Sequence, residues 1–213
     1  MNKLYSVILD LYGYDEPVFT KDLKKRVNMS DESIRQNIKR LSDNGYIIKV
    51  KNGIYYIPKA NSVLNKQRVN IDKLIGRKYI KPIDKKVIGY ITGTNFANQL
   101  GLTTQTACIL TIVTNEAGRL EREVTIGNRV VKLKKPRVKV NDQNYKLLQV
   151  LDLLNDYDRV SEIPLEKGSR LIKKYLQNSD ITISELNQYL KKYPRKTLEN
   201  VIEMERYNEL ARK

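Results

Sequence analysis

The chain has 213 residues, 40% of them apolar and 30% charged, which excludes a disordered chain and allows two or three small domains. Its net charge of +16 favours polyanionic partners such as nucleic acid, an anionic membrane surface or an acidic protein. The lack of histidine removes the commonest general base, the single cysteine excludes an internal disulfide, and no uncharged apolar run is long enough to span a membrane.

We therefore expect a cytoplasmic binding protein that is not an enzyme and that has no metal, cofactor, small-molecule ligand or membrane as a partner. The first residues, MNKLYSVILDLYGYDEP, include Asp10 and no small-residue cleavage site, so they do not resemble a signal peptide. Cys108 lies within the apolar run ACILTIV, which predicts a buried thiol.

Three short helices are predicted near the start of the chain. The first spans residues 3–12, Thr20 is expected to cap the second, and Ser30 is expected to cap the third, which stops at Gly45. Apolar residues follow helical spacing in the first helix (Leu4, Val7, Ile8 and Leu11) and in the third (Ile34, Ile38 and Leu41).

A β-hairpin is predicted directly after these helices, in the segment YIIKVKNGIYYIP. Asn52 and Gly53 separate two apolar runs, and this dipeptide favours a type I′ turn, in which both central residues have positive φ. Three helices followed by a hairpin are the order of a winged helix-turn-helix domain, whose third helix enters the major groove of DNA.

The outward side chains of the third helix and the hairpin suit contacts with double-stranded operator DNA. Lysine and arginine neutralise phosphates, arginine also binds guanine, and glutamine binds adenine. The candidates on the recognition helix are Ser33, Arg35, Gln36, Asn37, Lys39 and Arg40. The candidates for backbone and wing contacts are Lys24, Lys25, Lys49, Lys51 and Asn52. The alternatives are a domain that docks proteins and a helix that carries its charges for solubility.

The basic excess lies mostly in the middle of the chain. Residues 62–140 carry 16 Lys and Arg against 5 Asp and Glu, whereas residues 1–61 carry 11 against 7 and residues 141–213 carry 13 against 12. After a basic connector we expect a helix over 70–79, a strand over 87–91, a short helix over 94–100, a buried strand over 107–114 and a hairpin around Gly127 and Asn128. Gly89, Gly93 and Gly101 have neither the spacing nor the lysine of a phosphate-binding loop, so we assign them to turns and caps.

A run of cations, RVVKLKKPRVK, follows that second hairpin turn. On a strand, Lys132 and Lys134 share one face, opposite Val131 and Leu133. The candidates for a partner or nucleic-acid surface are Arg129, Lys132, Lys134, Lys135 and Arg137. The alternative is a solvated edge strand that its lysines protect from aggregation.

The last third is predicted to be helical. Leucines 147, 148, 151 and 154 share a face of one helix, a second helix covers 169–178, and two more are divided near Pro194. The last two repeat the order of the N-terminal pair, so a second helix-turn-helix is one alternative. We favour a helical bundle, because Glu199, Glu203 and Glu205 oppose phosphate.

Three segments, in this order, carry a family resemblance: NGIYYIPK at the end of the hairpin, then GYITGTNFANQLGLTTQ, then the strand ILTIVTN. Together they resemble the AbiEi-type antitoxins of abortive-infection (type IV) toxin–antitoxin systems, over approximately residues 1–140. Residues 141–213 have no counterpart that we can match to that family.

The resemblance implies a repressor of its own operon that also counteracts a nucleotidyltransferase-like toxin, with residues 93–105 in the antitoxin domain. It implies no catalytic residues. The expected organisation is α+β: a winged helix-turn-helix domain over 1–60, a basic α+β antitoxin-like domain over 61–140 and a helical region over 141–213. A stand-alone winged-helix regulator is one alternative. A metal-dependent nucleic-acid enzyme is another, which the lack of paired carboxylates in the middle region disfavours.

Overall fold

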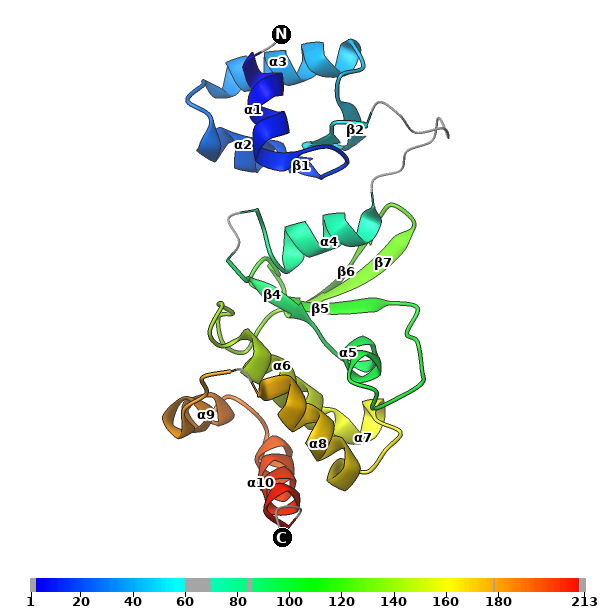
Figure 1. Ribbon diagram of the computed structural model, residues 1–213, viewed down its shortest axis with the longest axis vertical. Coiled ribbons are helices and arrows are strands. Elements are labelled where there is room, and N and C mark those ends of the chain that lie inside the picture. The colour runs from blue at the N-terminus through cyan, green and yellow to red at the C-terminus, as the bar shows by residue number, and fades with distance from the viewer. Residues whose placement is uncertain (1–2, 60–69, 84–85, 178, 211–213) are drawn as a thin grey trace. The chain divides into compact units, whose positions relative to one another are not determined.

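The computed structural model describes residues 3–59, 70–83, 86–177 and 179–210, except for the side chains of 206–210 (Figure 1). The protein is mixed α/β, and its described residues form ten helices and two small sheets. Its contacts divide the chain into two compact units, Met1–Arg77 and Lys78–Lys213. The expected domain boundary at residue 60 and the basic connector that follows it lie outside the described residues.

The first unit combines helices with a three-stranded antiparallel sheet. Its elements are α1 (Lys3–Tyr12), β1 (Val18–Phe19), α2 (Thr20–Arg26), α3 (Asp31–Asp43), β2 (Ile48–Lys51), β3 (Ile54–Tyr56) and most of α4 (Ile71–Tyr79). The strand order is β1-β3-β2, so β2 forms an edge of the sheet. All three predicted apolar residues of α3 are buried (Ile34, Ile38 and Leu41). These three residues share one face of α3, and the opposite face of the helix is exposed.

Helix α1 confirms the predicted helix, but its buried stripe differs from the prediction. Leu4 and Ile8 are buried as expected, whereas Leu11 is 38% exposed and Tyr12 only 8% exposed. The expected burial of Leu11 is therefore wrong, because the stripe advances by four residues at each step. The amide of Gly13, which has a φ of 77°, donates to Leu9 and ends the helix.

Thr20 does not cap α2, which corrects the prediction. It is the first helical residue, Phe19 occupies the cap position, and no side chain caps that end. The hydroxyl and the amide of Thr20 instead donate to the carbonyl of Gly53, at 3.2 and 2.9 Å. These long-range bonds hold the β2–β3 turn against the start of α2.

Ser30 caps α3 as predicted. Its hydroxyl accepts a hydrogen bond of 3.2 Å from the amide of Ser33, and Asp31 and Glu32 follow in the first turn, where carboxylates favour the helix dipole. At the other end, Gly45 has a φ of 73° and follows the cap residue Asn44, as the stop signal predicted.

Ser30→Ala is expected to lower the free energy of unfolding by about 1 kcal/mol, because the amide of Ser33 loses its acceptor. Urea denaturation followed by circular dichroism measures the change. Ser42→Ala, within the same helix, is the matched control and should change stability by less than about 0.5 kcal/mol. Equal effects of the two substitutions would contradict the capping role.

The β2–β3 hairpin is present, but its turn differs from the predicted type I′. Gly53 has a φ of 75°, whereas Asp15 is the only non-glycine residue with positive φ among the described residues, so Asn52 keeps a negative φ. The register shifts between Lys49 and Lys51, which is a β-bulge. The bulge supplies the twist that two positive φ angles would otherwise provide.

The second unit has a four-stranded sheet followed by helices. Its elements are β4 (Gly89–Ile91), α5 (Thr94–Gln99), β5 (Leu110–Thr114), β6 (Glu121–Ile126), β7 (Arg129–Lys134), α6 (Tyr145–Asn155), α7 (Tyr157–Val160), α8 (Leu165–Leu176), α9 (Ile183–Leu190) and α10 (Arg195–Leu210). The strand order is β4-β5-β7-β6, with β5 and β7 parallel and the other pairs antiparallel. The predicted hairpin around Gly127 joins β6 to β7.

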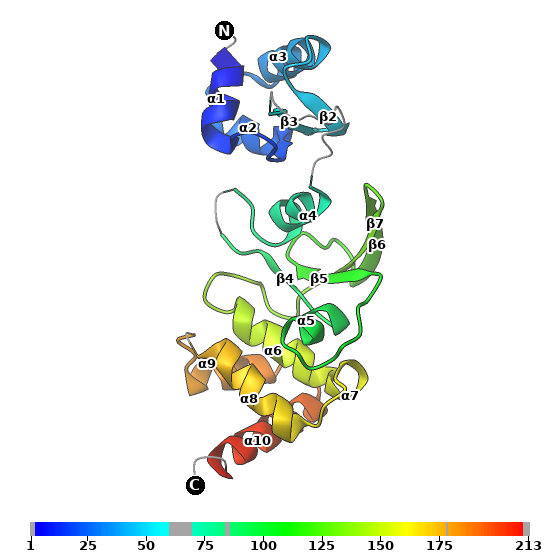
Figure 2. The ribbon, with the colours of Figure 1, turned by 45° about the vertical axis from the view of Figure 1, so that its right-hand side comes forward.

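One hydrophobic core joins the α5 segment to the C-terminal helices (Figure 2). Helix α6 packs against β4 and also contacts α8, α9 and α10. The four predicted leucines of α6 are all buried (Leu147, Leu148, Leu151 and Leu154). In the segment that carries the family resemblance, Phe96, Ala97 and Leu102 belong to this same core. The regions before and after residue 140 therefore share one interior.

Cys108 is exposed, so its predicted burial is wrong. Strand β5 begins at Leu110, and the cysteine lies in the preceding loop rather than in the strand. A thiol reagent is therefore expected to label one cysteine per native chain without denaturant, and Cys108→Ser should abolish the labelling. Labelling that begins only after unfolding would contradict the exposed position.

None of the helices in the described ranges combines the length and the apolar character needed to cross a membrane.

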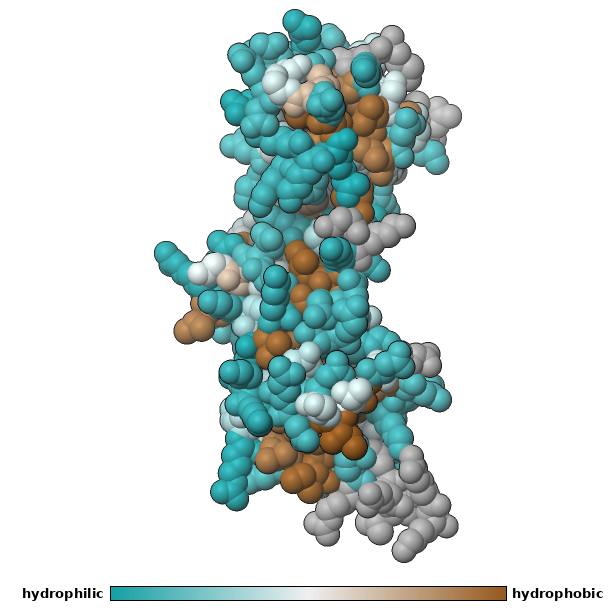
Figure 3. Space-filling model, turned by 90° about the vertical axis from the view of Figure 1, so that its left-hand side faces the viewer, coloured by the Kyte–Doolittle hydropathy of each residue, from teal (hydrophilic) through white to brown (hydrophobic). Residues whose placement is uncertain are grey.

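Hydrophilic side chains cover most of the face shown in Figure 3, and apolar residues form separate patches between them. The exposed apolar residues of the first unit include Tyr46, Ile48 and Val50, of which the last two belong to the edge strand β2.

Candidate nucleic-acid interface

The exposed face of α3 carries four of the six residues predicted to read DNA. Arg35, Gln36, Lys39 and Arg40 are all exposed. Their spacing places Arg35 over Lys39 and Gln36 over Arg40, in two adjacent rows along the helix. The face is therefore continuous, with three cations and one amide that can both donate and accept hydrogen bonds.

The remaining two predicted readers, Ser33 and Asn37, are half-buried at the margin of this face. The side-chain amide of Asn37 donates a hydrogen bond of 2.8 Å to the carbonyl of Ser33. Part of the hydrogen-bonding capacity of Asn37 is thus used within the helix, and its contribution to recognition depends on the groups that remain.

The two predicted contacts on α2 differ in their surroundings. Lys24 and Lys25 are both exposed, but the ammonium group of Lys24 forms an ion pair with Asp31 at the start of α3. This pair joins α2 to α3 and gives Lys24 a structural role. Lys25 keeps its charge directed to solvent, which suits the contact with a phosphate that was predicted for both residues.

The predicted wing contacts lie on an exposed strand and turn. Lys49, Lys51 and Asn52 are all exposed, and every residue of β2 is accessible. The bonds from Thr20 to the carbonyl of Gly53 position this turn relative to the helices. Sequence reasoning missed this link because it depends on two residues 33 positions apart.

The cations predicted on the second hairpin divide into two groups. Val131 and Leu133 are fully buried, which confirms that Lys132 and Lys134 share the opposite face of β7. Both lysines are half-buried and pair with Glu121 on β6, the contact from Lys134 being 3.8 Å. The hydrogen bond from Lys132 holds the pKa of the Glu121 carboxyl below its usual value, and the charges of both lysines act in the same direction.

Lys134, Lys135 and Arg137 line one pocket of about 430 Å³, whereas Arg129 lies at the other end of β7 and does not line it. We call this hollow the β7 pocket. Its other lining residues come from β5, β6 and α6 and from the segments that adjoin β4, β6, β7 and α6: Thr92, Val113, Leu120, Glu121, Pro136, Asp152, Asn155 and Asp156. Residues far apart in the chain therefore converge on one hollow of the second unit.

Asp152 is the most unusual group of the β7 pocket. The hydroxyl of Tyr90 donates to its carboxylate at 2.7 Å. Burial raises the pKa of Asp152, while hydrogen bonds from Tyr90 and Tyr193 and the charge of Arg137 oppose that shift. Arg137 also lies over the ring of Tyr193, with 5.1 Å between the guanidinium carbon and the ring centroid. Sequence reasoning missed Asp152, although a carboxylate inside the apolar run LLQVLDLLN was an available signal.

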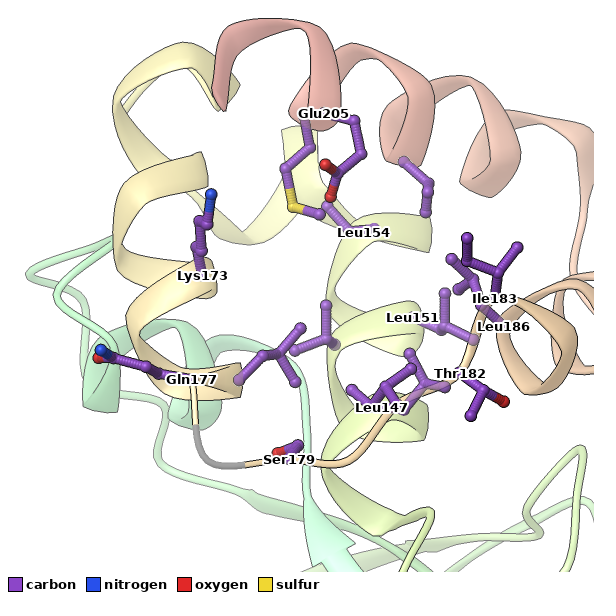
Figure 4. Close-up of a pocket in the computed structure, with 15 residues that line it drawn as sticks. Leu147, Leu151, Leu154, Lys173, Gln177, Ser179, Thr182, Ile183, Leu186 and Glu205 are labelled. Carbon is purple, nitrogen blue, oxygen red and sulfur yellow. The ribbon is translucent and has the colours of Figure 1, made fainter. Parts of the chain in front are cut away.

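A second hollow of about 320 Å³ lies between α6, α8, α9 and α10 (Figure 4). Its wall is largely apolar and includes Leu147, Leu151 and Leu154 of α6. Among the side chains that the structure describes, its charged lining residues are Lys173 and Glu205, which belong to different helices. The hollow is thus an opening into the hydrophobic core, unlike the polar β7 pocket.

The fold and its surfaces define a two-unit α/β protein with a basic helix face in one unit and a partly basic pocket in the other. The chain belongs to a family of unknown function (DUF6088), whose pattern matches residues 18–181. The matched region runs from β1 to just before α9 and so includes parts of both units. A search of the curated proteins found no match.

Proposed function

We propose that this protein is a sequence-specific DNA-binding regulator whose first unit is a winged helix-turn-helix domain. The order α1-β1-α2-α3-β2-β3, with β1 paired to β3, supports the assignment. The observation that carries it is the continuous exposed face formed by Arg35, Gln36, Lys39 and Arg40 on α3. A helix with this face offers both phosphate contacts and paired hydrogen bonds to base edges.

The hairpin supports the same proposal from a second side. Lys49 and Lys51 flank the bulge in β2, and both side chains are exposed. Gly53 holds the turn beside α2 through Thr20, and α2 leads directly into the turn before α3. The cations of the hairpin would then contact the sugar-phosphate backbone while α3 occupies the groove.

The test is binding of the full chain to the DNA upstream of its own gene, compared with shuffled DNA of equal length. Fluorescence anisotropy in a series of salt concentrations separates specific from electrostatic binding. We expect the upstream DNA to bind about 10³-fold or more tightly than the shuffled DNA at physiological salt. Equal affinity for both would reject a sequence-specific regulator.

We further propose that the protein is an antitoxin that represses its own operon and counteracts a nucleotidyltransferase-like toxin. This proposal rests on the resemblance of the segment around Gly93–Gln105 to AbiEi-type antitoxins. In that segment Phe96 and Leu102 are buried, whereas Asn98, Thr104 and Gln105 are exposed. A regulator that acts without a toxin is the alternative.

Co-expression with the product of the neighbouring gene tests the antitoxin proposal. The full chain is expected to restore growth, and so is the double variant Arg35→Ala/Arg40→Ala, because those residues lie on α3 and outside the resembling segment. Failure of the wild-type chain to restore growth, or a neighbouring gene that is not toxic, would favour the stand-alone regulator.

A further inference from the structure

The β7 pocket carries a balance of charges that favours an anionic ligand. Each of its three carboxylates is already engaged. Glu121 pairs with Lys132 and Lys134, Asp156 pairs with Arg159 at 2.7 Å, and Asp152 accepts the hydroxyl of Tyr90. The carboxylates therefore leave little attraction for a cation, and no three acidic or cysteine side chains gather into a metal site within the described residues.

The cations of the pocket are less fully engaged. Neither Lys135 nor Arg137 forms an ion pair in the part of the chain that the structure describes, and both are exposed. Arg137 donates one long hydrogen bond of 3.5 Å to the carbonyl of Lys192 and rests on Tyr193. Its remaining N–H groups, with the ammonium of Lys135, can bind the oxygens of a phosphate.

The pocket also has a wall that a bare anion would not need. Leu120, which is 84% exposed, Pro136 and the buried Val113 all line it. Asn155 also lines the pocket and is positioned by hydrogen bonds with Asp156 and Thr197, at 3.1 Å each. A volume of about 430 Å³ falls within the range of small-molecule sites, about 300–1,000 Å³.

We propose that the β7 pocket binds a nucleoside monophosphate, either free or as the phosphorylated end of a nucleic-acid strand. The phosphate contacts Lys135 and Arg137, and the base lies against Leu120 and Pro136. The proposal stands on the second unit alone and does not depend on DNA binding by α3. It departs from the expectation, drawn from sequence, that no small molecule is bound.

Isothermal titration calorimetry of the full chain with AMP, GMP, CMP and UMP tests the proposal, with inorganic phosphate titrated separately. We expect at least one nucleotide to bind at least tenfold more tightly than phosphate. A 5′-phosphorylated oligonucleotide and its unphosphorylated counterpart distinguish the two sources. Binding that requires the phosphorylated oligonucleotide and excludes the free nucleotides assigns the site to strand ends, and the reverse assigns it to free nucleotides.

Lys135→Ala and Leu120→Ser separate the phosphate and base contacts. Both side chains are exposed, so both variants are expected to fold. Lys135→Ala should weaken nucleotide and phosphate binding by about tenfold or more. Leu120→Ser should weaken nucleotide binding and leave phosphate binding unchanged. Arg122→Ala removes one exposed charge from β6 outside the pocket and serves as the matched control.

Three outcomes would overturn the proposal. One is the absence of binding by every nucleotide and oligonucleotide at millimolar concentration. Another is equal affinity for nucleotides and inorganic phosphate, which would leave a simple anion site. The third is a result in which no nucleotide binds, but an acidic peptide binds and Lys135→Ala weakens its binding. The variant Arg35→Ala should retain nucleotide binding, so failure of the DNA-binding proposal is distinguishable from failure of this one.

Discussion

Arg35→Ala is expected to weaken binding to operator DNA by about 1–3 kcal/mol, which corresponds to about 5- to 150-fold in Kd. Arg35 is exposed near the middle of the cationic face of α3, where a guanidinium group can form two hydrogen bonds to a guanine. Because that contact depends on the base, binding to unrelated DNA should fall much less. Fluorescence anisotropy with both DNAs measures the two losses.

Two further variants on α3 distinguish base contacts from phosphate contacts. Gln36→Ala should also reduce the preference for the operator, because a glutamine side chain reads adenine. Lys39→Ala should weaken binding to all sequences and reduce the slope of log K against log salt by about 1, as the loss of one phosphate contact predicts. Lys59→Ala removes a charge outside α3 and the hairpin and is the matched control. If Arg35→Ala lowered the affinity for operator and unrelated DNA to a similar extent, base recognition by Arg35 would be refuted.

Gly89→Ala is expected to be among the most destabilising single substitutions in the second unit. A methyl group at this position of β4 would lie 2.2 Å from the carbonyl oxygen of Tyr79 and 2.5 Å from that of Val113. Both atoms belong to the backbone, so neither can rotate away. Relief requires movement of β5 or of the chain beside Tyr79, and we expect a loss at or above the upper end of the usual range of about 1–3 kcal/mol.

Thermal and urea denaturation of the full chain, followed by circular dichroism, measures this loss. Gly118→Ala is the matched control in the same unit, because a methyl group there meets no atom within 4 Å and its φ is not positive. The control should change the free energy of unfolding by less than about 0.5 kcal/mol. If Gly89→Ala behaved like Gly118→Ala, the close approach of the backbone at β4 would be refuted.

The sequence accounted for the elements whose signals are local. The stop at Gly45, the cap at Ser30 and the turn at Gly127 depend on residues a few positions apart, and each is found where it was predicted. The alternation in β7 likewise identified Val131 and Leu133 as the buried face. Short-range geometry decides these features, because backbone hydrogen bonds and φ angles permit few alternatives there.

The errors lie where a distant partner competed with a local preference. Thr20 has the side chain of a helix cap, but its hydroxyl donates to Gly53 instead. Cys108 has apolar neighbours in sequence, yet β5 starts two residues later and its buried residues begin only at Ile112. Such competition cannot be read from a single segment, since its outcome depends on which groups the rest of the fold brings within reach.

The cationic face of α3 follows from local spacing, because the helical period alone separates Arg35 and Lys39 from the buried Ile34 and Ile38. The β7 pocket, in contrast, depends on contacts between distant segments of the chain. Asp152 lies on α6 and Lys135 follows β7, and neither has a neighbour in sequence that predicts the other. The packing of α6 against β4 helps to bring them together, and packing is a property of the whole chain.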